Sequence, residues 1–224
     1  MHSELLKCVP LFEGLNDDEL GALSQMASLR PFPRERVVIM AEEEGDTLFV
    51  IHRGQVKVSI VSEDGREVIL SILSEGDFFG EMSLLDGNPR SANVTTMQET
   101  ELLMLRRADF VRLIQNAPQI AVKLLSVLAG RLRKTDRQIE GLALSDVTGR
   151  ITQTLLQLAD EYGTPTAEGI LVRNRPTHQD LANMSGTTRE TVSRVLKRLE
   201  NQGYIAPRGK DLLIVGTDLP ATEV

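Results

Sequence analysis

Six short runs of β-forming residues, separated by turn residues, lie between Phe32 and Leu105 and constrain the fold more than any other feature. The runs cover residues 37–39, 48–51, 56–61, 68–73, 93–96 and 102–105. Gly45-Asp46 and Gly76-Asp77 divide them, and Asp64-Gly65 between two strong runs is typical of a tight hairpin. Short strands at such regular spacing predict an antiparallel sandwich or barrel.

Helical patterns flank these strands. Asn16 and the acids that follow it predict the start of a short helix before them. Pro118 opens a long helical stretch after them, which runs to about Leu144. The apolar pattern inside that stretch is spaced by four and three residues, at Leu128, Leu132, Thr135, Ile139 and Leu142. This two-heptad seam favours a dimer-forming helix, and a helix packed on its own domain is the alternative.

The charge is divided unevenly along the chain, whose net charge is -7. Residues 1–110 hold ten Lys or Arg and twenty Asp or Glu, whereas residues 170–210 hold eight and three. A basic segment in an acidic protein indicates nucleic-acid binding only weakly, and a solvated charged face is the alternative. Only 4% of the residues are aromatic, which disfavours stacking on single-stranded nucleic acid.

Composition narrows the class of protein. The hydrophobic share of 41% and the charged share of 25% are ordinary for a soluble globular protein, and charges interrupt every run that might span a membrane. The N-terminus lacks the apolar core of a secretory signal, and the single cysteine, Cys8, cannot form an intramolecular disulfide. We therefore expect a cytoplasmic protein without membrane contact.

No catalytic or metal-binding pattern has an interpretable spacing, so we expect neither an enzyme nor a metal site. Cys8 and His52 are expected to be structural, and Glu42-Glu43-Glu44 is expected to be a solvated loop.

The strongest motif for chemistry follows the fourth β-forming run. Gly80 permits a close backbone approach, and the helical turn that Met82 opens offers free N–H groups to an anion. Arg90 can pair with a phosphate, and Ser91 can add a hydroxyl donor. Glu81 can only accept hydrogen bonds when ionised, so it suits a sugar hydroxyl. The combination predicts a sugar-phosphate ligand.

This segment resembles the phosphate-binding cassette of cyclic-nucleotide-binding domains, with its Phe-Gly-Glu opening and its Pro-Arg-Ser-Ala close. The resemblance extends over essentially the whole chain to the cAMP receptor protein family of bacterial transcription regulators, through blocks 146–151 and 189–192. It implies an α+β fold in three parts. These are a jelly-roll-like cyclic-nucleotide-binding β-roll over residues 1–116, a dimerisation helix and hinge over residues 117–145, and a winged helix-turn-helix over residues 146–224.

The same resemblance implies cAMP as an allosteric ligand and assigns its contacts. The ligand-binding residues would be Gly80, Glu81, Met82, Arg90, Ser91, Thr135 and Asp136. Gly80 and Glu81 would hold the ribose, and Arg90 and Ser91 would hold the cyclic phosphate. Thr135 would contact the adenine amino group. The alternative for Thr135 is a polar seam position that only fixes the register of the two helices. Asp136 stands where the best-known member has a serine that reaches the base from the partner subunit, so the choice between cAMP and cGMP stays open.

A second constellation fits a helix-turn-helix. Thr177 and Asp180 form a capping-box pattern, and Gly186 separates this helix from the next. Arg189, Glu190 and Arg194 point outward after the turn, where arginine can pair with guanine and glutamate with cytosine. A solvated helix face is the alternative.

The resemblance also implies the DNA contacts. The outward Arg-Glu-Arg set matches the base-reading residues of the family, with TGTGA-like half-sites in a palindrome. Phosphates would be contacted by Thr177, His178, Gln179, Thr188 and Lys210, the last in the basic turn 208–210. His178 replaces an arginine of the best-known member, which makes one backbone contact weaker or dependent on pH.

These observations predict a homodimeric transcription regulator that responds to a cyclic nucleotide and binds double-stranded DNA, with RNA polymerase as a further partner. Ligand contact through Thr135 would reorient the C-terminal domains about a hinge near Leu144-Ser145. The alternatives are a regulator of the same fold that answers to cyclic di-GMP or to no ligand, and a cyclic-nucleotide-binding module that regulates a kinase or channel.

Overall fold

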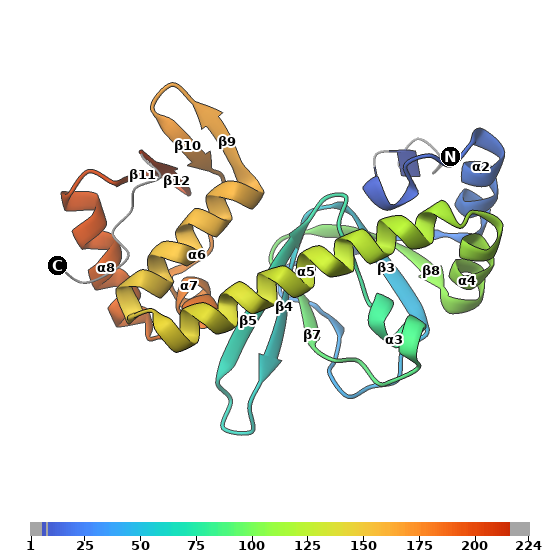
Figure 1. Cartoon of the computed structure of the whole chain (residues 1–224), viewed down its shortest axis with the longest axis horizontal. Coiled ribbons are helices and arrows are strands. Elements are labelled where there is room, and N and C mark those ends of the chain that lie inside the picture. The colour runs from blue at the N-terminus through green and yellow to red at the C-terminus, as the bar shows by residue number, and fades with distance from the viewer. Residues whose placement is uncertain (1–5, 8, 216–224) are drawn as a thin grey trace. The chain divides into compact units, whose positions relative to one another are not determined.

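The computed structural model describes residues 6, 7 and 9–215, so Cys8 and residues 216–224 lie outside the described part (Figure 1). The chain divides into two compact units, Met1–Leu132 and Arg133–Val224. The division falls inside helix α5 (Gln119–Leu144), between the boundaries that we predicted at residues 116 and 145.

The first unit contains two four-stranded antiparallel sheets. One has the order β1-β8-β3-β6, formed by Ser28–Phe32, Thr100–Arg106, Thr47–Arg53 and Phe78–Phe79. The other has the order β2-β7-β4-β5, formed by Val37–Ile39, Asn93–Thr96, Gln55–Val61 and Glu67–Ser74. All six predicted strands are present. The sequence did not reveal β6, which has two residues, or β1, whose Pro31 is tolerated because β1 lies at a sheet edge.

Strand β3 is buried on both faces, because Leu48 and Val50 pack in one apolar cluster and Phe49 and Ile51 in another. Phe49 of β3 and Phe79 of β6 stack with their ring centroids 5.1 Å apart, among buried residues that include Val56 and Val94 of the other sheet. The predicted hairpin between β4 and β5 is confirmed, with Gly65 in the left-handed region at φ 82°. The predicted sugar-phosphate motif follows β5 and is therefore attached to these packed sheets.

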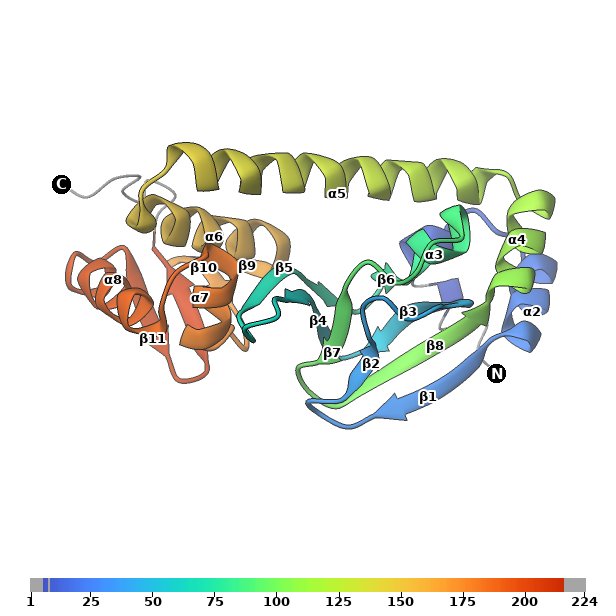
Figure 2. The same cartoon turned by 90° about the horizontal axis from the view of Figure 1, so that it is seen from below.

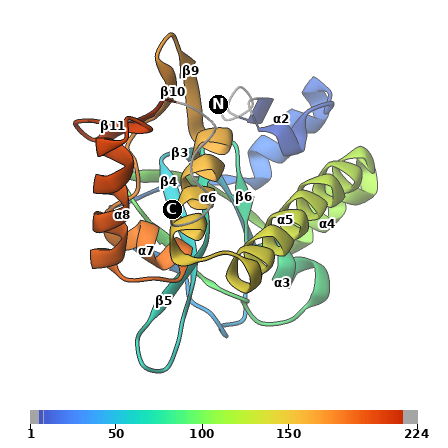
Figure 3. The same cartoon turned by 60° about the vertical axis from the view of Figure 1, so that its left-hand side comes forward.

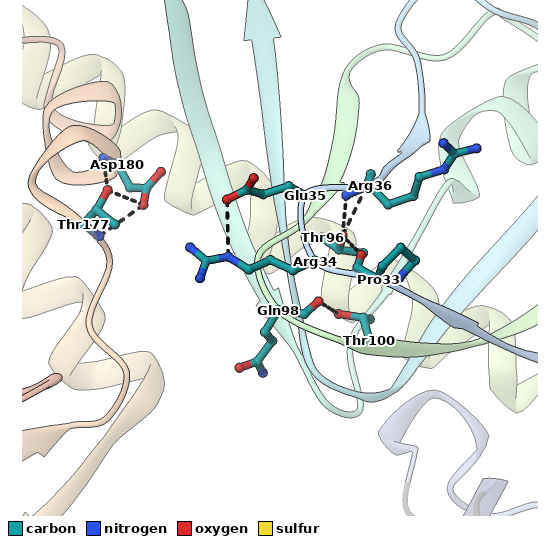
Figure 4. A network of polar contacts seen from close by, with 9 residues as sticks. All are labelled: Pro33, Arg34, Glu35, Arg36, Thr96, Gln98, Thr100, Thr177 and Asp180. Atoms are coloured by element: carbon teal, nitrogen blue, oxygen red, sulfur yellow. Dashed lines mark hydrogen bonds and ion pairs between the residues drawn. The ribbon is translucent and has the colours of Figure 1, made fainter.

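Thr96 fastens the loop between β1 and β2 to the second sheet (Figure 4). Its Oγ1 accepts the N–H of Arg36 at 2.8 Å and donates to the carbonyl oxygen of Pro33 at 2.7 Å. Glu35 lies between these two partners with a φ of 62°, so the buried hydroxyl stabilises a turn that the backbone alone disfavours.

Helices cover one side of this unit (Figure 2). They are η1 (Pro10–Phe12), α2 (Asp17–Met26), α3 (Glu81–Asp86), α4 (Arg107–Asn116) and the first part of α5. The predicted start of α2 is confirmed, since Asn16 and Glu19 form a reciprocal capping box. We did not predict α4, which begins without a side-chain cap after Arg106 and is stabilised by burial of Phe110 and Leu113.

Helix α5 begins after Pro118 and ends at Leu144, as the sequence indicated. Leu128, where the predicted dimer seam begins, is partly buried against the core of its own unit, and its place in a seam stays a prediction. The strongly exposed apolar side chains of this helix, each at least 59% exposed, are Val122, Leu125, Leu132, Ile139, Leu142 and Leu144.

The second unit contains α6 (Val147–Tyr162), α7 (His178–Ser185) and α8 (Arg189–Asn201) beside a small sheet (Figure 3). The sheet has the order β11-β12-β10-β9, formed by Ile205–Arg208, Asp211–Ile214, Gly169–Val172 and Gly163–Thr166. Asp146 caps α6 by accepting the N–H of Gly149 at 2.7 Å, as predicted. The break after α6 is confirmed, and its residues pair as the edge strand β9.

Within this unit the end of α5 packs on α6. Lys134 Nζ lies 2.9 Å from Glu161 Oε2, and the Lys134 side chain is only 15% exposed. Gly141 is buried beside Gln153, and a Cβ at Gly141 would lie 2.6 Å from the Oε1 atom of Gln153. A short two-residue connection, Ser145-Asp146, is therefore sufficient to reverse the chain.

Candidate functional site

Strand β6, Gly80 and α3 bring the predicted sugar-phosphate motif together. Gly80 is the N-cap of α3 at φ 82°, and α3 itself confirms the helical turn that we expected around Met82. The N–H groups in the first turn of a helix have no intrahelical acceptor, so they face outward from its start. Glu81, the first residue of α3, is only 3% exposed.

Arg90 lies inside this motif and is only 6% exposed. Its Nη1 donates to the carbonyl oxygen of Gly80 at 2.7 Å, and its Nη2 donates to that of Thr47 in β3 at 2.8 Å. Burial lowers the pKa of the Arg90 guanidinium because it disfavours the charge, whereas the carboxylates of Asp46 and Glu81 act in the opposite direction. The guanidinium thus joins the start of α3 to the neighbouring sheet.

The loop before β3 forms the other wall around Arg90. The N–H of Arg90 donates to the carbonyl oxygen of Glu43, and the N–H of Glu42 donates to that of Arg90. A Cβ at Gly45 would lie 1.9 Å from the Nε atom of Arg90, so only glycine leaves room for this side chain. The acidic side chains of this loop are exposed, as predicted, but its backbone positions the arginine.

Glu81 has a partner that sequence reasoning missed. Arg131 Nη1 in α5 donates to the Oε1 atom of Glu81 at 2.7 Å, and its other nitrogen donates to the carbonyl oxygen of Phe78. The guanidinium carbon also lies 4.8 Å from the centre of the Phe78 ring. This carboxylate keeps acceptor capacity for a further hydroxyl, because each carboxylate offers about four lone-pair sites. The contact joins residues 50 positions apart, so no local pattern could have indicated it.

The remaining predicted ligand residues lie at the surface. Ser91 and Met82 are exposed, and the Ser91 hydroxyl lies 3.6 Å from the Met82 sulfur. Thr135 and Asp136 are exposed on α5 in the part of that helix that belongs to the second unit. Their contribution to a ligand site stays a prediction. His52, which we expected to be structural, lies 3.7 Å from a Glu101 oxygen.

The second unit brings the other predicted set together as two short helices joined by a tight turn. Thr177 and Asp180 form the predicted capping box of α7 (Figure 4). Gly186 ends α7 in the left-handed conformation at φ 61°, and Thr188 caps α8 by accepting the N–H of Thr191. Buried Ala182, together with buried residues of α8, lies where the two helices pack.

The outward faces of these elements carry the predicted DNA contacts. The exposed residues are Thr177, Gln179, Thr188, Arg189, Glu190, Arg194 and Lys210. Arg189 and Glu190 occupy the first turn of α8, whereas Lys210 lies at the tip of the hairpin between β11 and β12. Exposed side chains at the start of a second helix match the geometry with which such motifs reach base edges.

His178 differs from its neighbours, because its ring is partly buried between elements. Its Nδ1 lies 2.8 Å from the hydroxyl of Ser193 in α8, and its Nε2 lies 3.3 Å from Nη1 of Arg175. Burial lowers the pKa of His178 first, and the charges of Arg175 and Arg189 lower it further.

Arg150 is a second residue whose role the sequence did not indicate. Its Nε donates to the carbonyl oxygen of Ser185 at 2.9 Å, and its Nη1 donates to that of Ser145 at 3.1 Å. One side chain from α6 therefore stabilises both the turn after α7 and the connection before α6.

Comparison with known proteins assigns both units. Residues 29–117 match the cyclic nucleotide-binding domain, and residues 149–221 match the Crp-like helix-turn-helix domain. Over 211 residues the chain is 36% identical to the CRP-like cAMP-activated global transcriptional regulator of Mycobacterium tuberculosis, covering 94% of each protein. It is 41% identical over 191 residues to the cAMP-activated global transcriptional regulator CRP of Pasteurella multocida, covering 84% of this chain and 90% of that one.

A solved structure agrees with this assignment. The c-di-GMP responsive global regulator CLP of Xanthomonas campestris matches with a TM-score of 0.76 at 29% identity, covering 90% of this chain and all of that one. The described helices include none long and apolar enough to cross a bilayer. Across the same residues, no three His, Cys, Asp or Glu side chains gather as a possible metal site.

The fit of Arg90 against Gly80 generates a prediction. A Cβ at Gly80 would lie 2.7 Å from Nη1 of Arg90, whereas one at Gly87 would meet no atom within 4 Å. Both glycines have φ values between 75° and 82°, so alanine at either position should destabilise the fold by about 1 kcal/mol. We expect only Gly80→Ala to displace Arg90 and to weaken cyclic-nucleotide binding at least tenfold, measured by calorimetric titration.

Gly87→Ala is the matched control for backbone strain. Equal affinity of the two variants would show that the position of Arg90 does not matter for the ligand.

Proposed function

The chain belongs to the CRP family of cyclic-nucleotide-binding transcription regulators, and we propose that it is a homodimer whose binding to DNA is controlled by cAMP. The proposal includes a cytoplasmic location, recognition of palindromic sites with TGTGA-like halves, and contact with RNA polymerase. The two curated regulators that we compared are named as cAMP-activated proteins, which supports this choice of ligand.

The observation that carries the ligand assignment is the buried Arg90 beside the start of α3. A guanidinium has five N–H donors, and the carbonyl oxygens of Gly80 and Thr47 account for two of them. Its remaining donors, together with the Ser91 hydroxyl and the N–H groups that open α3, form a suitable cradle for one phosphate. Glu81, held by Arg131, then suits the adjacent ribose hydroxyl.

Cyclic di-GMP is the second candidate ligand, because the regulator CLP, which has a similar fold, is described as responsive to it. That ligand carries two phosphates and two guanine bases, whereas the cradle around Arg90 and Ser91 offers donors for a single phosphate. We therefore place cAMP first. Asp136 can accept a hydrogen bond from the adenine amino group, but it can equally accept from the N1–H and the amino group of guanine, so the preference for cAMP over cGMP rests on the named relatives.

The dimer is proposed from the exposed face of α5. Five apolar residues, at spacings of three, four, three and seven positions, lie exposed on one face of this helix: Val122, Leu125, Ala129, Leu132 and Ile139. An apolar stripe of this length on one helix is typical of a surface that pairs with a second copy. In such a pair Thr135 and Asp136 lie at or beside the seam, where ligand contacts can change how the two helices meet.

The control of DNA binding follows from these contacts. A ligand that binds one arrangement of the two helices more tightly shifts the population toward it. Helix α5 ends at Leu144, and Ser145-Asp146 connects it to α6, so we infer that this connection is the hinge. Coupling of this kind typically amounts to about 1–3 kcal/mol.

The ligand assignment is tested by calorimetric titration with cAMP, cGMP and cyclic di-GMP. We expect cAMP to bind most tightly and Arg90→Leu to lose at least tenfold in affinity, because the phosphate loses its buried partner. Arg106→Leu removes an exposed arginine outside the cradle and should bind as the wild type does. Circular dichroism establishes that both variants fold. Tighter binding of cyclic di-GMP, or unchanged affinity of Arg90→Leu, contradicts the assignment.

The dimer predicts a specific effect of charge on the stripe. Ile139→Asp places an unpaired carboxylate in the seam, which is costly, so we expect dissociation to monomers at micromolar concentration in sedimentation experiments. Arg137→Asp introduces the same carboxylate on the opposite side of the helix and should leave the dimer intact. A monomeric wild-type protein in this concentration range would refute the homodimer.

The proposed DNA contacts predict that two variants lose affinity for DNA in different ways. Arg189→Ala should cost about 1–3 kcal/mol on the consensus palindrome and much less on a site whose matching guanine is changed. Lys210→Ala should weaken all sites alike and flatten the salt dependence, because phosphate contacts carry little base information. Fluorescence anisotropy at several salt concentrations measures both. If Arg189→Ala weakened binding to all sites alike and Lys210→Ala weakened binding to one site only, then Lys210 would read the base and Arg189 would contact the phosphate.

A further inference from the structure

The ring of His178 joins three elements of the DNA-binding unit. His178 is the first residue of α7, and its Nδ1 meets the hydroxyl of Ser193, one turn along α8 from Arg189. Its Nε2 meets Arg175, which precedes α7 and whose backbone N–H donates to the carbonyl oxygen of Lys210 in the hairpin. The ring therefore contacts α8, the recognition helix of the proposed DNA-binding motif, directly. It contacts the hairpin between β11 and β12 through Arg175.

The partners fix where the proton of the ring lies. A guanidinium can only donate hydrogen bonds, so the Nε2 atom that faces Arg175 must accept and cannot carry a proton. The proton of the neutral ring then lies on Nδ1, from which it is donated to the Ser193 hydroxyl. In the free protein this arrangement holds His178 in one neutral tautomer.

The charges that face the ring favour that neutral form. Arg175 on the preceding segment and Arg189 on α8 both lower the pKa of His178, after burial, which has the largest effect. On its own helix the carboxylate of Asp180 accepts from the backbone N–H and the hydroxyl of Thr177. On the hairpin, Asp211 accepts the N–H of Asn174.

A DNA phosphate changes this balance. The first helix of a helix-turn-helix crosses the DNA backbone, and the N-terminus of a helix attracts phosphate. A protonated ring keeps its Nδ1 donor to Ser193 and gains an Nε2 donor for the phosphate, because Nε2–H can no longer accept from Arg175. Arg175 is thereby released and becomes available to the same strand of DNA.

We propose that His178 is a positioning residue that holds the recognition helix through Ser193 and binds the DNA backbone as an imidazolium, so that each protomer takes up one proton on binding. This inference rests on the proposed DNA-binding dimer and adds a dependence on pH. The affinity for DNA should rise as the pH falls, because the pKa of His178 would be higher in the complex. A group whose pKa is higher in the complex than in the free protein strengthens binding as the pH falls between those two values.

The test measures the affinity of the full-length protein, saturated with cAMP, for a palindromic duplex with TGTGA half-sites between pH 5.5 and 8 at constant ionic strength. One proton per protomer allows at most about a tenfold gain per pH unit for each protomer. We expect the affinity to rise as the pH falls and His178→Gln to remove most of this dependence. His52→Gln changes a histidine of β3 and should keep it.

A second variant and a second measurement guard against a folding defect. His178→Arg carries a permanent charge, so it should bind at pH 8 as tightly as the wild type binds near pH 6, with little dependence on pH. Calorimetry in two buffers of different ionisation enthalpy should detect proton uptake by the wild type and none by His178→Arg.

The possible results distinguish a failure of the His178 inference from a failure of the proposed DNA-binding function. Binding by the wild type without a pH dependence, or a dependence that His178→Gln retains, overturns the inference alone. Absence of binding at every pH overturns the proposed DNA-binding function and the inference with it.

Discussion

The contact of the Arg90 guanidinium with the carbonyl oxygens of Gly80 and Thr47 is the interaction on which the ligand site depends. It joins the start of α3 to strand β3, and the backbone of the loop at Glu42 and Glu43 closes around it. Leaving a buried donor without acceptors is costly, so the fold holds this charge in place before any ligand arrives. The glycines at 45 and 80 follow from that requirement, because a side chain at either position would meet the guanidinium.

Helix α5 contributes side chains to contacts in both units. In the first unit its Arg131 pairs with Glu81 of the cradle, and in the second unit its Lys134 pairs with Glu161 of α6. Arg131 and Lys134 lie three positions apart on α5, and the exposed apolar stripe lies on another face of this helix. Residues of α5 therefore take part in contacts within each unit and, in the proposed dimer, in contacts with a second copy.

Local signals predicted most of the fold. The capping residues Asn16, Asp146 and Thr177 and the turn at Gly186 are where the sequence placed them, since caps and left-handed turns depend on a few adjacent residues. The sequence did not reveal what depends on distant partners. Strand β1 exists because it pairs with β8, and Leu128 packs against the core of its own unit. The contacts of Arg131 and His178 join residues 50 and 15 positions apart.

The proposed coupling between the cradle around Arg90 and helix α8 must be reciprocal, and both directions can be measured. By thermodynamic linkage, filling both sites of the dimer with cAMP must strengthen binding to a TGTGA palindrome by the product of the factors by which that duplex strengthens cAMP binding at the two sites. We predict that the gain in DNA affinity, measured by anisotropy, equals the product of the two gains in cAMP affinity, measured by calorimetry on the same protein, and that the gain at each site lies between about 5 and 150. No gain in either measurement, with ligand and DNA each still bound, would show that the ligand site and the DNA-binding helix are not coupled.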